Sequence, residues 1–170
     1  MKIIKISILL LLIGAIVLAG DKPGSVRPTP SFDKIKSLAG SWKGKDAQGK
    51  SILVSYKVVS AGNSVMEEMI MGDISDAMIT MYHLDGDATM LTHYCSMGNQ
   101  PRMRAAALAK DGKSLSFSFV DATNLASPQA DCMTDLVVRF KDADHFSQQW
   151  TMRVGGKSQP HETFEYERVK

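Results

Sequence analysis

Gly40-Ser41-Trp42 stands between a short helical segment and a long succession of alternating segments, and this position decides the fold. Thr29-Pro30 is typical of a helix start, because Thr caps the first free amides and Pro fits the first turn. Apolar residues then recur at helical spacing as far as Leu38. We therefore predict one short helix over residues 30–39, which Gly40 ends.

After this segment, apolar residues occupy every second position, which is typical of half-buried strands. Asp85-Gly86 lies between two such runs and is a strong hairpin signal. About nine or ten strands follow one another at short spacing. A long sheet with one apolar face must close to hide its edges. The sequence thus predicts an all-β, antiparallel up-and-down barrel of about 8–10 strands over residues 30–170.

The first 20 residues have the pattern of a signal peptide, with Lys2 and Lys5 before an apolar run and small residues at its end. A retained membrane helix is the alternative, because the run approaches the length of a span. Residues 21–29 carry Pro and Gly and are predicted to be a flexible leader. Asp21 stands where a lipid-anchored protein would need Cys, so we expect an exported, periplasmic or secreted protein without a stable membrane anchor.

Removal of the signal peptide would take away two lysines and no acid, which balances the 20 basic and 18 acidic residues of the whole chain. No block of Lys and Arg is left that could follow a phosphate backbone. We therefore do not expect nucleic acid as a partner.

The short helix, Gly40-x-Trp42 and Arg168 near the end together resemble the lipocalin-like (calycin) β-barrels, over about residues 32–168. More specifically, the chain is similar to an uncharacterised exported bacterial family of that superfamily. The stretches that carry this likeness are Met81-Tyr82-His83-Leu84-Asp85-Gly86-Asp87, Leu91-Thr92-His93-Tyr94-Cys95, Gly98-Asn99-Gln100-Pro101-Arg102-Met103, Asp121-Ala122-Thr123-Asn124 and Asp144-His145. The resemblance implies a barrel with a cavity, in which the Trp closes the floor and the Arg stacks over it. It implies no settled activity, and the paired Cys pattern of lipocalins is missing.

The densest polar cluster predicts a site that orients a ligand. Its members are His93, Tyr94, Cys95, Asn99, Gln100 and Arg102. His93 and Cys95 share one face of a strand, whereas Tyr94 takes the other. In this hypothesis Arg102 binds a carboxylate, and the amides bind carbonyl or amide groups. The alternative is a hydrogen-bonded hairpin in which the amides hold backbone groups.

Our first functional hypothesis is binding of a small, largely apolar or amphipathic ligand inside the barrel. The predicted lining is Tyr56, Met69, Phe117, Phe119 and Trp150. A second hypothesis is an enzyme that uses His93 with Cys95 or Arg102 in the same cavity. A third is an accessory protein whose barrel is packed solid and whose surface binds a partner. The sequence does not choose the ligand.

Cys95 and Cys132 are the only cysteines, and outside the cytoplasm this pair could form a disulfide. Such a bridge would exclude cysteine catalysis. If the two thiols stay free and buried, they behave as small apolar side chains.

We predict no bound cofactor, although the sequence leaves two alternatives open. Haem could bind through a single His, with His93 the best placed, as in a related barrel family. The 11 methionines could bind Cu(I) through their thioethers, or they could form an adaptable apolar lining. Strand alternation should divide them between two faces, which disfavours copper. His and Cys spacings give no zinc motif.

Overall fold

The computed structural model describes residues 29–170 except 47, 73–76 and 106. Within these residues the chain forms one short α-helix, one 3-10 turn and ten strands. The elements are α1 (Pro30–Lys36), β1 (Gly40–Lys45), β2 (Ser51–Val59), the 3-10 turn η1 (Ser60–Gly62), β3 (Ser64–Met71), β4 (Met78–Asp85), β5 (Ala88–Tyr94), β6 (Gln100–Ala105), β7 (Ser114–Thr123), β8 (Cys132–Phe140), β9 (His145–Val154) and β10 (Lys157–Arg168). The predicted all-β barrel with a short N-terminal helix is confirmed.

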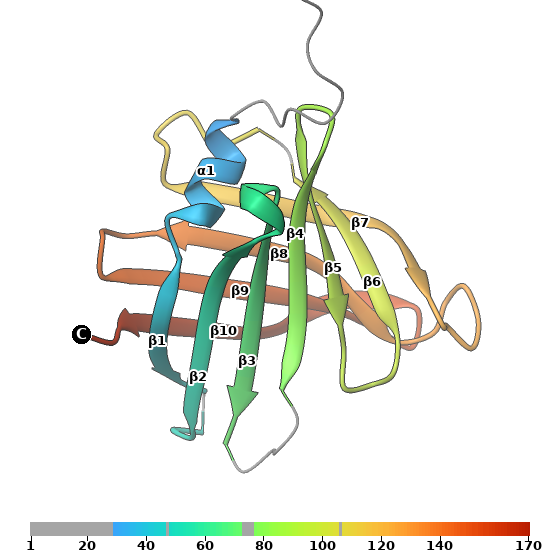
Figure 1. Ribbon diagram of the computed structural model, residues 1–170. Helices are drawn as coiled ribbons and strands as arrows, with labels where there is room; N and C mark the ends of the chain where they lie inside the picture. Colours follow the sequence, from blue (N-terminus) through green and yellow to red (C-terminus); the bar gives the residue numbers. More distant parts are fainter. Residues whose placement is uncertain (1–28, 47, 73–76, 106) are drawn as a thin grey trace, which may run out of the picture.

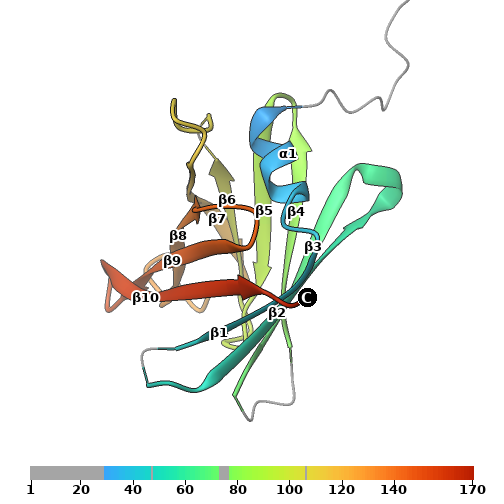
Figure 2. The ribbon, with the colours of Figure 1, turned by 90° about the vertical axis from the view of Figure 1, so that its left-hand side faces the viewer.

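Each strand pairs antiparallel with the next in sequence, and β10 returns to pair with β1, so the barrel is closed. In Figure 1 the strands β1 to β5 run steeply, whereas β8 to β10 cross behind them at a large angle. Figure 2 shows α1 lying beside one end of the barrel, next to β4 and β5. Closure leaves no free sheet edge among the described strands, which is how such a sheet avoids pairing with another chain.

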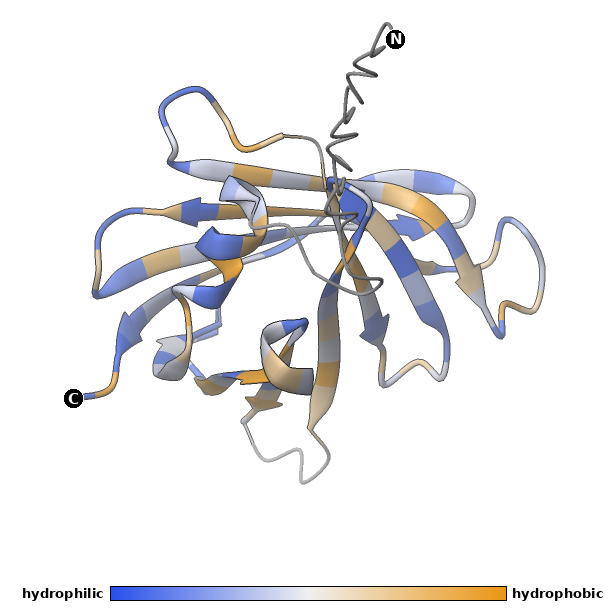
Figure 3. Ribbon diagram, turned by 45° about the horizontal axis from the view of Figure 1, so that its top comes forward, coloured by the Kyte–Doolittle hydropathy of each residue, from blue (hydrophilic) through white to orange (hydrophobic). Residues whose placement is uncertain are grey.

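Strict alternation of side chains builds the core. On β2 the buried positions are Ile52, Val54 and Tyr56, and the residues between them face outward. A similar alternation recurs along β3, β5, β6 and β8 and appears in Figure 3 as alternating bands of colour, whereas β9 buries Phe146, Ser147 and Gln148 in succession. The apolar inner faces of all the strands therefore pack against one another inside the barrel.

The helix begins as the sequence predicts and ends earlier. The Thr29 hydroxyl accepts a hydrogen bond from the Phe32 amide at 3.3 Å. However, α1 ends at Lys36 rather than at residue 39. The last residues form a tight turn, in which the Ala39 amide donates to the Lys36 carbonyl. This turn directs backbone carbonyls toward the end of β10.

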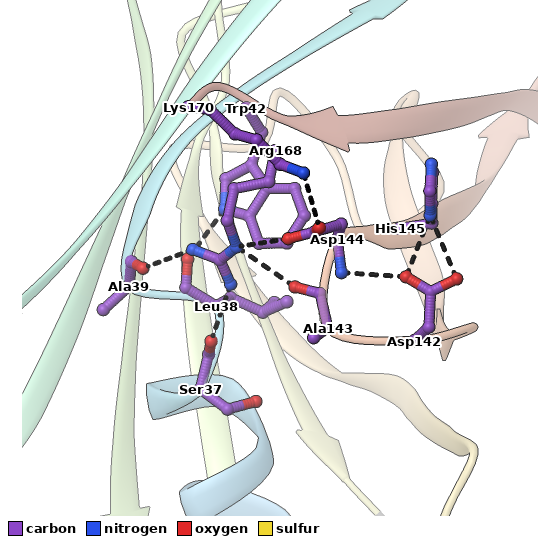
Figure 4. A network of polar contacts seen from close by, with 10 residues as sticks. All are labelled: Ser37, Leu38, Ala39, Trp42, Asp142, Ala143, Asp144, His145, Arg168 and Lys170. Atoms are coloured by element: carbon purple, nitrogen blue, oxygen red, sulfur yellow. Dashed lines mark hydrogen bonds and ion pairs between the residues drawn. The ribbon is translucent and has the colours of Figure 1, made fainter.

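Trp42 and Arg168 join the first and the last strand of the barrel (Figure 4). They are register partners across the β1–β10 seam, and the Arg168 guanidinium lies 4.0 Å from the centre of the Trp42 ring. The guanidinium also donates to the carbonyls of Ala39 at 2.9 Å, Ser37 at 3.2 Å and Ala143 at 3.1 Å. One side chain thus holds the helix exit, β1 and the β8–β9 hairpin together.

Gly40 is required at this junction for two reasons. Its φ of +126° lies in the region that favours glycine. A Cβ atom added there would lie 2.9 Å from Arg168 Nη1. The spacing Gly40-x-Trp42 therefore gives the guanidinium room to reach both the Trp ring and the helix exit.

We predict that Arg168→Ala lowers the free energy of unfolding by about 2–4 kcal/mol, because it removes a cation–π contact and several charge-assisted hydrogen bonds. Arg168→Lys should recover only part of this loss, since an ammonium group cannot reproduce the planar arrangement of hydrogen-bond donors of the guanidinium. Urea denaturation measures both effects. Arg104→Ala, which removes an exposed pair with Asp85, is the matched control and should change stability by less than about 1 kcal/mol. Equal losses in the Arg168 and Arg104 variants would contradict the prediction.

The predicted signal peptide (1–20) and all but the last residue of the predicted leader (21–29) lie outside the described residues. In the part of the chain that is described, no helix has the length and apolar character needed to cross a membrane.

Candidate functional site

A buried polar network crosses the middle of the barrel. Tyr82 donates its hydroxyl to the Glu67 carboxylate at 2.5 Å. The Gln148 amide donates to the same carboxylate at 3.1 Å and to the Tyr56 hydroxyl at 2.9 Å. Tyr166 completes the network by donating its hydroxyl to the side-chain oxygen Oε1 of Gln148 at 3.3 Å. Residues of β2, β3, β4, β9 and β10 thus meet at one carboxyl group.

Burial governs the titration of this network. It raises the pKa of Glu67 above the ordinary value, although hydrogen bonds from Tyr82 and Gln148 act in the opposite direction. Burial, followed by the charge of Glu67, also raises the pKa values of Tyr56, Tyr82 and Tyr166. The network is saturated with internal partners, so it acts as a polar plug rather than as an open binding surface.

We predict that Glu67→Leu lowers the free energy of unfolding by about 2–4 kcal/mol, because it leaves a buried hydroxyl and a buried amide without their acceptor. Glu67→Gln keeps an acceptor oxygen and should cost less. The raised pKa gives Glu67 a stabilising contribution that is fully present below pH 4.5 and is lost as the pH rises through the folded-state pKa. Wild type should therefore lose stability relative to Glu67→Gln in urea denaturation as the pH rises above 4.5. A difference that does not change with pH would contradict this.

A small cavity of about 40 Å³ lies beyond this plug, at the end of the barrel opposite α1. The end of β3 and the start of β4 contribute to it, and both lie at the lower end of the barrel in Figure 1. The described residues that line the cavity are Met69, Met71, Met78, His93, Met133, Trp150, His161 and Phe164. We call the space that these residues enclose the methionine cavity. Its walls are apolar except for two imidazoles.

His93 is the buried polar group of the methionine cavity. Its Nδ1 lies 2.9 Å from the Thr80 hydroxyl, and its ring centre lies 4.9 Å from that of Trp150. Burial lowers the pKa of His93 from 6.5 to about 4. The imidazole is therefore neutral at physiological pH. Because Thr80 occupies Nδ1, Nε2 is the nitrogen available to a ligand.

Bulges on both sides of β9 shape the opposite wall. On β10 the register shifts between Pro160 and Glu162, so His161 is the extra residue. On β8 it shifts between Met133 and Asp135. A bulge changes the direction in which the neighbouring side chains point. Both bulges pair with the same part of β9, around Thr151. His161 and Met133 join the cavity wall from these irregular positions.

We predict that wild type loses stability as the pH falls from 6.5 to 4, and that His93→Gln does not share this loss. The lowered pKa means that the unfolded chain takes up a proton in this interval before the folded protein does. The loss should approach about 3 kcal/mol, at roughly 1.4 kcal/mol per pKa unit. Urea denaturation at several pH values measures it. His161→Gln, at an exposed position, is the control, and an equal change in that variant would contradict the assignment to His93.

Most residues of the predicted lining lie inside the barrel, but they do not form one pocket. Met69 and Trp150 reach the methionine cavity. Tyr56 belongs to the polar plug, and Phe117 is buried among core side chains. Phe119 is only half-buried, and the guanidinium of a neighbouring arginine lies 5.3 Å from its ring centre.

The polar cluster that the sequence predicts to orient a ligand, called the predicted rim below, does not assemble around the methionine cavity. Strand alternation places Tyr94 on the outer wall, where it is 50% exposed. Arg102 also points outward, and its guanidinium makes a bidentate ion pair with Asp121. Its charge is therefore satisfied by a neighbouring strand. Among the predicted polar residues, His93 is the one placed on the wall of the methionine cavity.

The amides of the predicted rim instead hold a turn, as the alternative interpretation proposed. Gln100 donates to the Gly98 carbonyl at 3.0 Å, and Asn99 donates to the Asp131 carbonyl at 3.0 Å. Within the described residues, Asn99 Oδ1 is the one buried side-chain oxygen or nitrogen atom without a hydrogen-bond partner. These contacts attach the turn between β5 and β6 to the start of β8.

The cysteine pair is not bridged in this structure. Cys95 and Cys132 are both free and buried. Burial raises the pKa of Cys132, although Arg153 Nη2 lies 3.2 Å from its sulfur and acts in the opposite direction. A protonated, buried thiol is a poor nucleophile. This argument applies to Cys132; Cys95, the cysteine of the catalytic hypothesis, is buried as well.

Larger depressions occur on the outer wall of the barrel. One of about 620 Å³ lies over the β1–β10 seam, where Lys43 and Lys141 alternate with Glu165 and Glu167. Lys141 pairs with Glu165, and Lys43 pairs with Glu167 at 3.5 Å. This surface is open and its charges are already matched, so it offers less to a specific ligand than the methionine cavity does.

Sequence reasoning missed several residues of the interior. Glu67 and Gln148 were not identified as a network, and Met133 and His161 were not placed at a site. The alternation of β3 could have shown that Glu67 points inward. In the sequence, the one sign of these bulges is Pro160, because proline has no amide hydrogen to donate to a neighbouring strand. In the part of the chain that the structure describes, no three His, Cys, Asp or Glu side chains are grouped to hold a metal.

Comparisons with known proteins identify the fold alone. No family model matches this sequence, and no curated protein matches it. Among solved structures, the chain is similar to a protein with unknown function from the DUF3598 family of Nostoc punctiforme, with a TM-score of 0.51 and 13% identity. The match covers 79% of this chain and 49% of that chain, so this chain corresponds to about half of its neighbour. Membership of the lipocalin-like superfamily remains an expectation from the resemblance.

Proposed function

We propose that this protein is an exported binding barrel of the lipocalin-like type, which holds a small apolar or amphipathic molecule at the methionine cavity. The observation that carries the proposal is the composition of that cavity. Flexible thioether side chains and two aromatic rings surround a single deeply buried polar group, His93. Pockets for small molecules have this character, with an apolar wall and a few polar groups that set orientation.

The small volume of the cavity defines how binding would occur. About 40 Å³ is far below the roughly 300 Å³ or more that a typical small-molecule pocket offers. Methionine has several rotatable bonds and repacks at low cost, which makes it common at adaptable binding surfaces. Met71, Met78 and Met133 are only partly buried, so they can move outward and enlarge the cavity. A ligand would therefore enter by displacing methionine side chains.

The same observation separates this proposal from the alternatives. A catalytic Cys95 would need a base beside it, but Cys95 is buried and is not among the described residues that line the cavity, and the Nδ1 of His93 is engaged by Thr80. Haem would need a space many times larger than the existing cavity. A barrel packed solid remains the competing hypothesis, and it requires that the methionine cavity take no occupant.

We predict that the neutral fluorophore N-phenyl-1-naphthylamine binds the protein and that Met78→Trp weakens binding at least tenfold, because the indole fills the cavity. Fluorescence titration measures the affinity. Met81→Trp is the matched control: Met81 lies on the same strand but between the inward-facing Thr80 and Tyr82, so it faces outward. Native mass spectrometry of the purified protein provides a second measurement, in which a retained small molecule should disappear in Met78→Trp. No binding in wild type, or equal binding in all three proteins, would overturn the proposal.

A further inference from the structure

We infer that the methionine cavity also binds a soft monovalent metal ion, Cu(I), through the thioether sulfurs of Met69 and Met78 and the imidazole of His93. Met71 provides a further donor on the same wall, and Met133 and His161 provide donors on the opposite wall. The inference rests on the proposed cavity as a ligand site and adds a second class of ligand to it. Neither the fold nor the structural neighbour assigns such a site.

Strand pairing places the first two sulfur donors together. Met69 on β3 and Met78 on β4 are direct register partners, and both line the cavity. Side chains of such a pair leave the sheet about 5 Å apart on the same face. Met71 lies two residues further along β3 and therefore on the same face. Alternation divides the methionines between the two faces, as expected, but it also gathers this subset inside the barrel.

The opposite wall brings donors that strand alternation alone would not predict. Met133 and His161 reach the cavity from the bulged parts of β8 and β10. These strands are far from β3 and β4 in sequence, and they lie across the barrel from them. Thioethers and imidazoles thus surround the cavity from both sides, rather than forming a stripe on one strand.

His93 is positioned as a metal ligand commonly is. Its Nδ1 is engaged by Thr80, which fixes the ring and leaves Nε2 for the cavity. Trp150 packs against the same imidazole and also lines the cavity. An indole face attracts a cation that has lost its water shell. Both residues therefore favour a monovalent cation at this position.

The donor set selects the metal. Thioether sulfur is a soft ligand that favours Cu(I), whereas Zn²⁺, Mg²⁺ and Ca²⁺ prefer thiolate, imidazole or carboxylate. None of the described residues that line the cavity is Asp, Glu or Cys. A site of neutral donors suits a single positive charge better than two. The volume of about 40 Å³ accommodates an ion without displacement of the walls.

The test uses Ag(I), which has the same ligand preference and no accessible second oxidation state, and Cu(I) in anaerobic competition with bathocuproine disulfonate. Calorimetry with Ag(I) should show one tight site. The double variant M69L/M78L should weaken it at least tenfold, because Leu keeps the apolar volume and removes the sulfur. The matched control is M66L/M81L, since Met66 and Met81 are also register partners but on the outer face.

Two further measurements keep the outcome decisive. The variant C95S/C132S should retain the site, which excludes capture of silver by the thiols. In protein labelled with ¹³C at the methionine methyl groups, Ag(I) should shift the signals of Met69, Met71, Met78 and Met133, but not those of Met66 and Met81. This readout works in wild type and does not depend on the folding of any variant.

Equal loss of Ag(I) binding in M69L/M78L and M66L/M81L, or complete loss in C95S/C132S, would overturn the metal site. Its failure is distinguishable from that of the proposed function, because Ag(I) and N-phenyl-1-naphthylamine are titrated separately into the wild-type protein. Binding of the fluorophore without Ag(I) supports the apolar site alone. Binding of Ag(I) without the fluorophore supports the metal site alone.

Discussion

The β1–β10 seam, held by the Arg168–Trp42 contact, is the constraint on which the barrel depends. Every other strand pair joins neighbours in sequence, whereas this pair joins the two ends of the described chain. Its closure costs the most chain entropy, so it needs the strongest local support. That support comes from one guanidinium that binds an aromatic face and several backbone carbonyls at once. Without it, the seam would depend on the backbone pairing of residues 42–45 with β10 alone.

The interior has two layers with different physical roles. Near its middle, a carboxyl group, three tyrosines and a glutamine satisfy one another and leave no free capacity. Toward the end opposite α1, methionines leave a small space bordered by His93. The first layer is rigid because each polar group holds another. The second can repack because thioether chains have many conformations of similar energy. The ligand site that we propose belongs to the second layer for this reason.

The fold could be predicted from sequence because it depends on local signals. Period-two alternation, the Asp85-Gly86 hairpin and the Gly40-x-Trp42 spacing each act over a few residues. The helix end was misplaced because a long-range contact with Arg168 competes with the last helical turn. The site was harder to predict, since it depends on which strands face each other across the barrel. Alternation shows that Met69 points inward, but it does not show that Met133 meets it from β8. The predicted polar residues do not surround the methionine cavity, because Tyr94 and Arg102 lie on the outer wall and the two amides hold the turn between β5 and β6.

The polar network around Glu67 has a consequence for the size of any occupant. Its hydrogen bonds connect β2, β3 and β4 to β9 and β10 across the interior, so they fix the distance between opposite walls. A barrel of larger girth would break them and leave a carboxyl group buried without donors. The middle of the barrel therefore cannot widen to accommodate a bulky ligand. Evolution of a new specificity in this scaffold would have to proceed by exchange of the methionines near the opening, or by loss of the central carboxylate first.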